Sequence, residues 1–348
     1  MTFTPEQDDL RAGVRKLLDR EAEPWPALCA QIGIAALLVP ERFGGFATEL
    51  TTPPAHSGQA PGLTEAQIVA EELGRHLADV PFLGSSVLAV TSLLTTIDTS
   101  TNTAPDALSR LLPPLATGSA GALAWTSDGR WDTHQPAFTT DGSTVDGIAH
   151  YVLDAAGADL LLAAARTPDG PALFEVDPAH SGVRCAPVPT MDETCHLATV
   201  TLDHVRARPL GPVDLARVRD VACAVLAAEQ AGAAAQALDL TVEYTQQRVQ
   251  FGRPIGSFQA LKHRMADLHV QVETARSAAY AAPRSSRLAA VAKVHCSEVF
   301  TKVAAEMIQL HGGIAITWDH PAHRYLKRAH ATAQLFGAPH HHLSRVHP

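Results

Sequence analysis

The spacing of apolar residues changes twice along this chain, and this limits the folds that it can adopt. Helix signals dominate the start: Thr4-Pro5 provides an N-cap and a first-turn proline, and a capping box is predicted to open a helix over Thr64–Leu77. Short alternating runs such as Ala198–Leu202, separated by Asp-Gly turns, then predict strands. We therefore expect a helical domain over 1–117 and an antiparallel β domain over 118–209.

Long amphipathic helices return after residue 210. Apolar residues recur every three or four positions, as expected for one buried face of a helix. One such stripe holds Leu261, Met265, Leu268, Val272 and Ala275, and a second holds Val299, Val303, Met307 and Leu310. With a short last helix near 322–335, the region 210–348 is predicted to be a four-helix bundle, and the fold class is α+β.

Composition excludes several classes of protein. The chain has 348 residues, of which 46% are hydrophobic, so it is long enough to bury the cores of more than one domain. A net charge of −9 without a long Lys/Arg run argues against a general nucleic-acid binder. Five scattered cysteines without a CxxC pair indicate reduced thiols in a cytoplasmic protein. The acidic N-terminus and the short apolar runs predict neither a signal peptide nor membrane insertion.

The run from Arg248 to Gln259 separates two of the long helices and carries chemistry suited to a nucleotide cofactor. The guanidinium of Arg248 is suited to a pyrophosphate, which it binds through two hydrogen bonds. The ring of Phe251 and the amide of Gln259 suit a base and a sugar. The alternative is a helix–turn–helix corner with a solvated arginine.

Several further motifs occur in a fixed order along the chain. Together with the three-domain order they make the chain resemble the acyl-CoA dehydrogenase family, over nearly its whole length. Because a glutamate is missing, it looks similar to the short subunits of heteromeric actinobacterial dehydrogenases of the steroid side-chain type. The motifs are Leu38–Gly45, Glu71–Arg75, Asp146-Gly147, Gln309–Trp318 and His320–Arg328.

The resemblance implies an FAD bound across a subunit interface. In the family, one subunit holds the adenosine end of its neighbour's FAD through an arginine, an aromatic ring, amides and glycines, and glycines let backbone approach phosphates closely. The corresponding positions in this chain are Arg248, Phe251, Gln259, Gln309, Gly312 and Gly313.

The resemblance also implies a glutamate that removes the α-proton of an acyl-CoA, and here both family positions for it lack a carboxylate. Phe336 occupies one and Ala222 the other. Loss of a general base commonly costs about 10²–10⁴-fold in rate. No catalytic residue is therefore assigned. Asp220 and Glu229, on the same helix as Ala222, are atypical candidates for the base. The alternative is that Asp220 is a solvated or ion-paired residue and that Glu229 is a buried polar group with a partner.

The family's flavin-contacting segments are altered as well. The counterpart of its aromatic-x-Thr wall is Tyr151-Val152-Leu153, which keeps the ring and loses the hydroxyl. Thr126 is a candidate flavin contact, with ordinary strand surface as the alternative. His340, His341 and His342 do not predict a metal site, because consecutive histidines cannot all face one ion; a solvent-facing tail is expected. His320 and His323 are expected to be structural or interfacial.

Three functions follow from these observations. The leading hypothesis is a subunit of a FAD-dependent acyl-CoA dehydrogenase that completes the FAD site of a partner chain. The partner would carry the base, the substrate would be an acyl-CoA of steroid origin, and electron-transferring flavoprotein would accept the electrons. The alternatives are a self-sufficient homodimeric dehydrogenase with an unusual base and a non-enzymatic scaffold.

Overall fold

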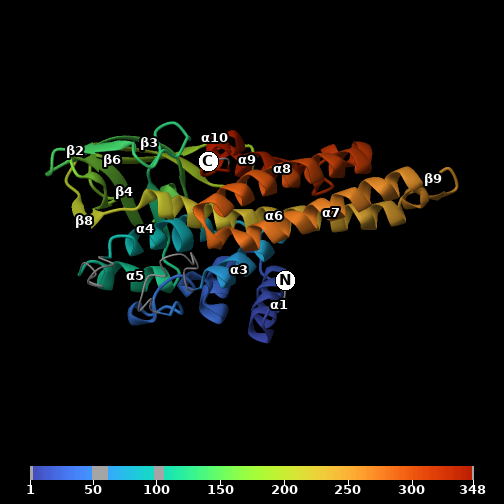
Figure 1. Cartoon of the computed structure of the whole chain (residues 1–348), viewed down its shortest axis with the longest axis horizontal. Helices are drawn as coiled ribbons and strands as arrows, with labels where there is room; N and C mark the ends of the chain where they lie inside the picture. Colours follow the sequence, from blue (N-terminus) through green and yellow to red (C-terminus); the bar gives the residue numbers. More distant parts are fainter. Residues whose placement is uncertain (1–2, 49–61, 98–105, 347–348) are drawn as a thin grey trace.

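A computed structural model describes residues 3–48, 62–97 and 106–346. Figure 1 shows the β-sheet and the N-terminal helices at one end of the molecule, with three long helices extending past them. The N-terminal region consists of α1 (Pro5–Leu18), α2 (Pro24–Ala27), α3 (Leu63–His76), the π-helical η4 (Phe82–Ala89), α4 (Val90–Leu94) and α5 (Leu108–Ala116).

Two helix starts test the capping predictions. Thr4 caps α1 as expected: its Oγ1 accepts a hydrogen bond from the backbone N–H of Gln7 at 3.3 Å, and the Gln7 side chain accepts one from Thr4 N–H. The capping box at Thr64 was wrong, because α3 begins at Leu63 and the N-cap is Gly62. Gly62 has a φ of +78° and lies against the carbonyl of Leu37, where a side chain would not fit.

The middle region is a single twisted sheet with the order β6-β7-β3-β2-β4-β5-β8, and β1 also pairs with β4. Its strands are β1 (Gly121–Ala124), β2 (Phe138–Thr140), β3 (Val145–Leu153), β4 (Leu160–Thr167), β5 (Gly170–Val176), β6 (Val183–Val188), β7 (Leu197–Val205) and β8 (Arg208–Pro212).

The sheet is mixed and not wholly antiparallel as expected. Both β1 and β2 run parallel to β4, while the other pairings are antiparallel. Tight turns join antiparallel neighbours only, so the Asp-Gly signals could not reveal strands that pair through longer connections.

The C-terminal region is built around α6 (Leu215–Gln247), with α7 (Gln259–Ala281) and α8 (Ser286–His311) beside it and α9 (Ala322–Gln334) and α10 (Pro339–Val346) after them. The short hairpin of β9 (Val249–Gln250) and β10 (Arg253–Pro254) joins α6 to α7 at the far end of the bundle. Helix α6 is long and apolar enough to cross a membrane, but 89% of its most apolar window is buried inside the protein. It is thus packed as the central helix of a core.

Helices α3 and α6 touch through their backbones. A Cβ on Gly74 would lie 2.0 Å from the carbonyl oxygen of Glu229, and one on Gly232 would lie 1.9 Å from that of Glu71. Glycine is therefore required at both positions. This contact fixes the N-terminal helices against the C-terminal bundle.

Candidate functional site

The predicted nucleotide-binding residues lie at the projecting end of the bundle. Arg248 is the C-cap of α6, and in the described part of the chain its exposed guanidinium makes no ion pair or hydrogen bond. Phe251 turns the β9–β10 hairpin with a φ of +53°, and its ring is 90% exposed. Gln259 opens α7, where its exposed amide nitrogen lies 3.4 Å from Nε2 of His263. All three groups are available to a ligand or a partner.

The motif Gln309–Trp318, here called the glycine motif, begins at the end of α8, on the same projecting part of the molecule. Gln309 is exposed, Gly312 has a φ of +66°, and no other residue comes within 4 Å of the position of a Cβ on Gly312 or Gly313. Tyr244, in the last turn of α6, stacks on His311 at 4.3 Å and donates a hydrogen bond to the carbonyl of His311. The fold thus brings the two predicted motifs to one end of the bundle.

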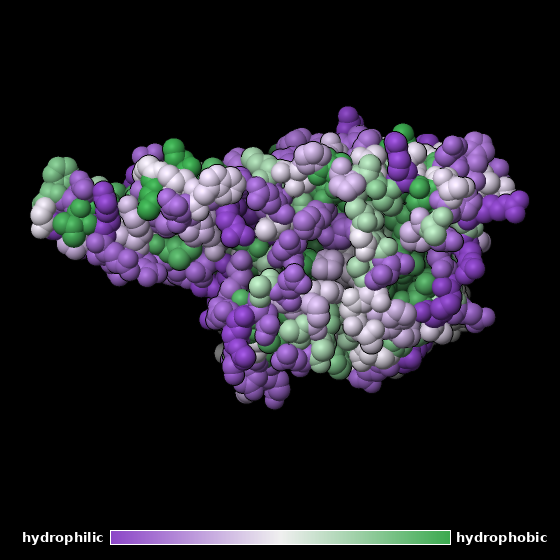
Figure 2. All heavy atoms as spheres, turned by 180° about the vertical axis from the view of Figure 1, so that it is seen from behind, coloured by the Kyte–Doolittle hydropathy of each residue, from purple (hydrophilic) through white to green (hydrophobic). Residues whose placement is uncertain are grey.

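Exposed apolar side chains surround these groups. Figure 2 shows apolar residues on the surface of the projecting bundle. Large hydrophobic side chains exposed there include Val249 (54%), Val270 (62%), Ile316 (76%) and Trp318 (75%). Exposed apolar surface on this scale marks contact surfaces more often than free ones.

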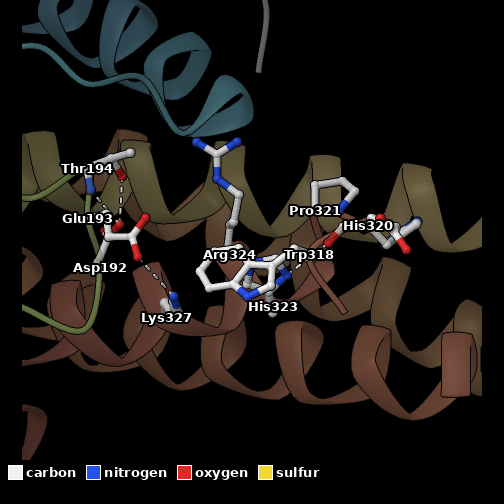
Figure 3. Close-up of a pocket in the computed structure, with 10 residues that line it drawn as sticks. Asp192, Glu193, Thr194, Trp318, His320, Pro321, His323, Arg324 and Lys327 are labelled. Carbon is white, nitrogen blue, oxygen red and sulfur yellow. Dashed lines mark hydrogen bonds and ion pairs between the residues drawn. The ribbon is translucent and has the colours of Figure 1, made fainter. Parts of the chain in front are cut away.

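A charged recess adjoins the glycine motif (Figure 3). It has a volume of about 390 Å³ and lies between the Asp192–Thr194 turn and the segment from Trp318 to Lys327. Two of its acidic residues are ion-paired: Glu193 Oε1 lies 3.6 Å from Lys327 Nζ, and Asp192 Oδ2 lies 2.5 Å from Arg328 Nε. Asp319 and Arg324 also line the recess. The Trp318 ring lies edge-on to His323, and Lys327 Nζ lies 4.6 Å from the centre of the Trp318 ring. His320 and His323 serve as local structural contacts, since the carbonyl of His320 accepts a hydrogen bond from His323 Nδ1.

A second and larger cavity lies between the sheet and α9–α10. This cleft has a volume of about 740 Å³, and its mainly apolar wall includes Trp131, Tyr151, Met191, Leu197 and Leu335. Trp131 and Tyr151 both have a φ of +57°, a strained conformation that a fold retains where its surroundings require it. Tyr151 is the residue that the family resemblance placed at the flavin ring. The cleft therefore lies where the reactive end of a flavin is implied.

The family's base position does not face this cleft. Phe336 is fully buried, and its ring packs edge-on against Trp131 at 5.0 Å, which packs in the same way against Trp125 at 5.2 Å. Ala222 is also fully buried, inside α6. Trp131, backed by Trp125, fills the space beside position 336, so a carboxylate placed there would be buried against these rings.

The two alternative bases are both engaged elsewhere. Glu229 is buried and pairs with Arg328 at 2.5 Å; burial raises the pKa of its carboxyl, and the arginine opposes that shift. Asp220 pairs with Arg345. Neither carboxylate lines the large cleft. Both residues instead have the ion-paired, partnered roles that were the alternative.

The structure also shows where Thr126 and the histidine run lie. Thr126 is buried, and its hydroxyl oxygen accepts hydrogen bonds from Gly129 and Trp131 N–H, so it shapes the β1–β2 connection and does not line the large cleft. The predicted solvent-facing histidine tail was wrong for His342. That residue lies on α10 with 2% exposure, because its ring contacts the backbone of Phe336, whereas His340 and His341 are exposed.

Comparison with known proteins identifies the family. Residues 220–347 match the family model "Acyl-CoA dehydrogenase, C-terminal domain". The chain is 40% identical to the acyl-CoA dehydrogenase IpdE2 of Mycobacterium tuberculosis over 367 residues, covering 99% of this chain and 98% of the relative. This chain belongs to the acyl-CoA dehydrogenase family. Proteins of this family are oxidoreductases that act on CH–CH bonds. In this chain, Phe336 and Ala222 stand at the two family positions for the base.

Solved acyl-CoA dehydrogenase structures show the same fold over nearly the whole chain. The Tcur3481-Tcur3483 steroid acyl-CoA dehydrogenase, in its G363A variant, superimposes with a TM-score of 0.82 at 30% identity, covering 98% of this chain and 96% of that one. The ChsE4-ChsE5 complex from Mycobacterium tuberculosis superimposes with a TM-score of 0.81 at 26% identity, covering 99% and 97%.

Proposed function

We propose that this chain is a subunit of a FAD-dependent acyl-CoA dehydrogenase and that it completes the FAD site of a partner chain. The observation that carries this proposal is an asymmetry within the chain. The groups suited to a nucleotide, Arg248 and Phe251, are exposed at the tip of the bundle, and among the described residues the Arg248 guanidinium makes no ion pair or hydrogen bond. At position 336, where the family base is implied, a buried aromatic ring stands instead.

The residues at the tip fit the adenosine end of an FAD. The free guanidinium of Arg248 would pair with the pyrophosphate, and the exposed ring of Phe251 would lie against the adenine. The open backbone at Gly312 and Gly313 leaves room for close approach of a phosphate or ribose. The flavin supplies the acceptor for the β-hydride of the acyl chain. The residues near the reactive end fit a flavin less well, since Thr126 Oγ1 already accepts two backbone hydrogen bonds within its own turn.

The partner is a second acyl-CoA dehydrogenase chain that supplies the base. Two observations support it: among the described residues no carboxylate lines the large cleft beyond Asp128, which is exposed, and the two solved structures above are each named for two chains. The name of one of them, a steroid acyl-CoA dehydrogenase, supports a steroid-derived acyl-CoA as substrate. Electron-transferring flavoprotein is the proposed electron acceptor.

The test is flavin retention by the purified complex of this chain with a candidate partner dehydrogenase. Arg248→Ala is expected to weaken FAD binding at least tenfold, because it removes a charge-assisted, two-point contact of about 1.5–3 kcal/mol with a phosphate. Bound flavin is measured by absorbance after gel filtration. Arg184→Ala, an exposed arginine on the sheet, is the matched control.

Three results would contradict the proposal: two come from the flavin measurement and one from an acyl-CoA oxidation assay of this chain alone. Wild-type flavin content in the Arg248→Ala complex would remove the tip from the FAD site. Full acyl-CoA oxidation by this chain alone would indicate the self-sufficient enzyme. The substitutions Asp220→Ala and Glu229→Ala would then show which residue is its base. A complex without flavin in any variant would indicate the non-enzymatic scaffold.

A further inference from the structure

The turn between α9 and α10 forms part of the cleft wall in a strained conformation. Phe336 has a φ of +60° and Gly337 a φ of +96°. A phenylalanine in the left-handed region costs free energy and persists only where neighbouring groups hold it there. Leu335 and Ala338, on either side, line the cleft, whereas Phe336 does not line it and packs its ring edge-on against Trp131, which does.

One buried imidazole holds this turn. Nε2 of His342 lies 2.9 Å from the carbonyl oxygen of Phe336, and the residue is 2% exposed. Its other ring nitrogen, Nδ1, lies 2.9 Å from Nη1 of Arg345. A guanidinium only donates hydrogen bonds, so Nδ1 must be the acceptor and the proton must be on Nε2. The imidazole therefore donates to the Phe336 carbonyl in its neutral form.

A carboxylate on the central helix holds the arginine in turn. Arg345 Nη2 pairs with Asp220 of α6 and also donates to the hydroxyl of Ser286 at 2.8 Å. Asp220, Arg345, His342 and the Phe336 carbonyl thus form one chain of contacts, from α6 through α10 to the turn. This gives Asp220 a role other than that of a base.

The glycine beside Phe336 leaves the space that the imidazole needs. A Cβ on Gly337 would lie 3.1 Å from His342 Nε2 and 3.4 Å from the carbonyl oxygen of Arg130. The left-handed φ and this close approach both favour glycine there. The turn, the glycine and the histidine therefore form one structural unit.

We propose that His342 is a positioning residue: its Nε2–H fixes the carbonyl of Phe336 and so keeps Leu335 and Ala338 in the wall of the cleft, with Asp220 and Arg345 selecting the tautomer. The inference goes beyond the proposed function, because it concerns the cleft of this chain and not the FAD contacts at the tip. It holds whether or not the chain binds a partner.

The charges around His342 keep its ring neutral. Arg345 of α10, Lys293 of α8 and Arg219 of α6 all carry positive charge near it, and the one carboxylate in the chain of contacts, Asp220, is paired with Arg345. Burial lowers the pKa of His342 to about 4; the hydrogen bond to the Phe336 carbonyl opposes this shift, and these cations add to it. The contribution of the neutral ring is complete above the ordinary pKa of 6.5 and is lost as the pH falls toward 4.

The test compares two substitutions in the full-length chain with Trp25 and Trp318 replaced by phenylalanine, so that fluorescence reports Trp125 and Trp131. His342→Gln offers an N–H to Phe336 and an oxygen to Arg345, while His342→Leu fills the space without either. We expect His342→Leu to raise the acrylamide quenching constant at least twofold at pH 7. This substitution should also remove the pH dependence of the quenching constant between pH 6.5 and 4. His342→Gln should keep the wild-type quenching constant at pH 7.

The proposal would be overturned if His342→Leu and the wild type had equal quenching constants. It would also be overturned if the quenching constant rose equally in the glutamine and leucine variants. If the leucine variant does not fold, ¹⁵N-histidine spectra of the wild type decide, with His342→Gln assigning the resonance. A neutral ring protonated on Nε2 at pH 7 supports the proposal. A ring protonated on Nδ1, or a doubly protonated ring, contradicts it.

Discussion

Phe251 and Phe336 occupy the two contrasting regions of the C-terminal bundle. Both have a left-handed backbone, with φ values of +53° and +60°. Phe251 is 90% exposed at the tip, whereas Phe336 is fully buried beside the cleft. The same backbone strain thus presents one ring to solvent and inserts the other into an aromatic cluster. An exposed ring held in this way suits contact with another molecule, and a buried one stabilises the chain itself.

The comparison separates two kinds of residue in one fold. At the tip, the side chains contribute little to the packing of the chain, so substitutions there are expected to affect binding. Beside the cleft, Trp125, Trp131 and Phe336 pack on one another, so substitutions there are expected to affect stability. The predictions below test this division.

The largest expected effect comes from placing the missing carboxylate at position 336. Phe336→Glu buries an acid among aromatic rings and is expected to destabilise the chain by about 4 kcal/mol or more at pH 8. It should not produce acyl-CoA oxidation by the chain alone. Urea unfolding and a dye-reduction assay measure the two effects, with Phe336→Leu as the control for lost ring volume. A stable and active variant would show that the position faces the cleft after all.

Truncation of the two phenylalanines should separate the regions directly. Phe336→Ala is expected to cost about 3–5 kcal/mol, because it leaves a cavity in the aromatic cluster. Phe251→Ala should change the stability of the isolated chain by less than about 0.5 kcal/mol and should weaken flavin binding by the complex. Urea unfolding of both variants measures the two changes in stability, and flavin absorbance of the complex measures binding. Similar stability losses in the two variants would erase the distinction.

A smaller effect is expected at Asp154, beside the buried Glu229–Arg328 pair. Burial first, and then nearby Asp79, raise the pKa of Asp154 to about 7, against opposing shifts from His196 and Arg328. Its stabilising contribution is therefore complete below the ordinary pKa near 4 and is lost as the pH rises through 7. Asp154→Asn should be more stable than the wild type at pH 8 by about 1 kcal/mol or more. An unfolding free energy with unchanged pH dependence would contradict this account.

The smallest effect is expected at the exposed histidines of α10. His341→Ala should change the free energy of unfolding by less than about 0.5 kcal/mol, and added Zn²⁺ should not alter the melting temperature of either protein. Thermal unfolding with and without the metal tests both expectations. A zinc-dependent rise in the melting temperature that His341→Ala removes would establish a metal site.

Periodicity predicted most of the fold because it follows from burial on one face. The stripe from Leu261 to Ala275 became one face of α7, and the Thr4 cap became the start of α1. The parallel pairings of β4 and the N-cap at Gly62 were missed, because each depends on a contact with residues distant in the chain. Local patterns do not record such contacts.

The candidate site was predicted unevenly for the same reason. The resemblance located Arg248 and Gly312 as motifs, and the structure shows them exposed at one end of the bundle. It also located Phe336, but not the ring cluster around it, since Trp125 and Trp131 lie about two hundred residues earlier in the chain. The histidine run suggested a solvent-facing tail, and only the packing of α10 reveals that His342 is buried.

The most direct test of the central claim is anaerobic flavin reduction by an acyl-CoA substrate, followed by absorbance, in this chain alone and in its complex with a partner dehydrogenase. The account predicts that the complex reduces its flavin and that this chain alone does not. Reduction by the chain alone at the rate of the complex would contradict the division between a nucleotide-binding tip and a cleft without a base.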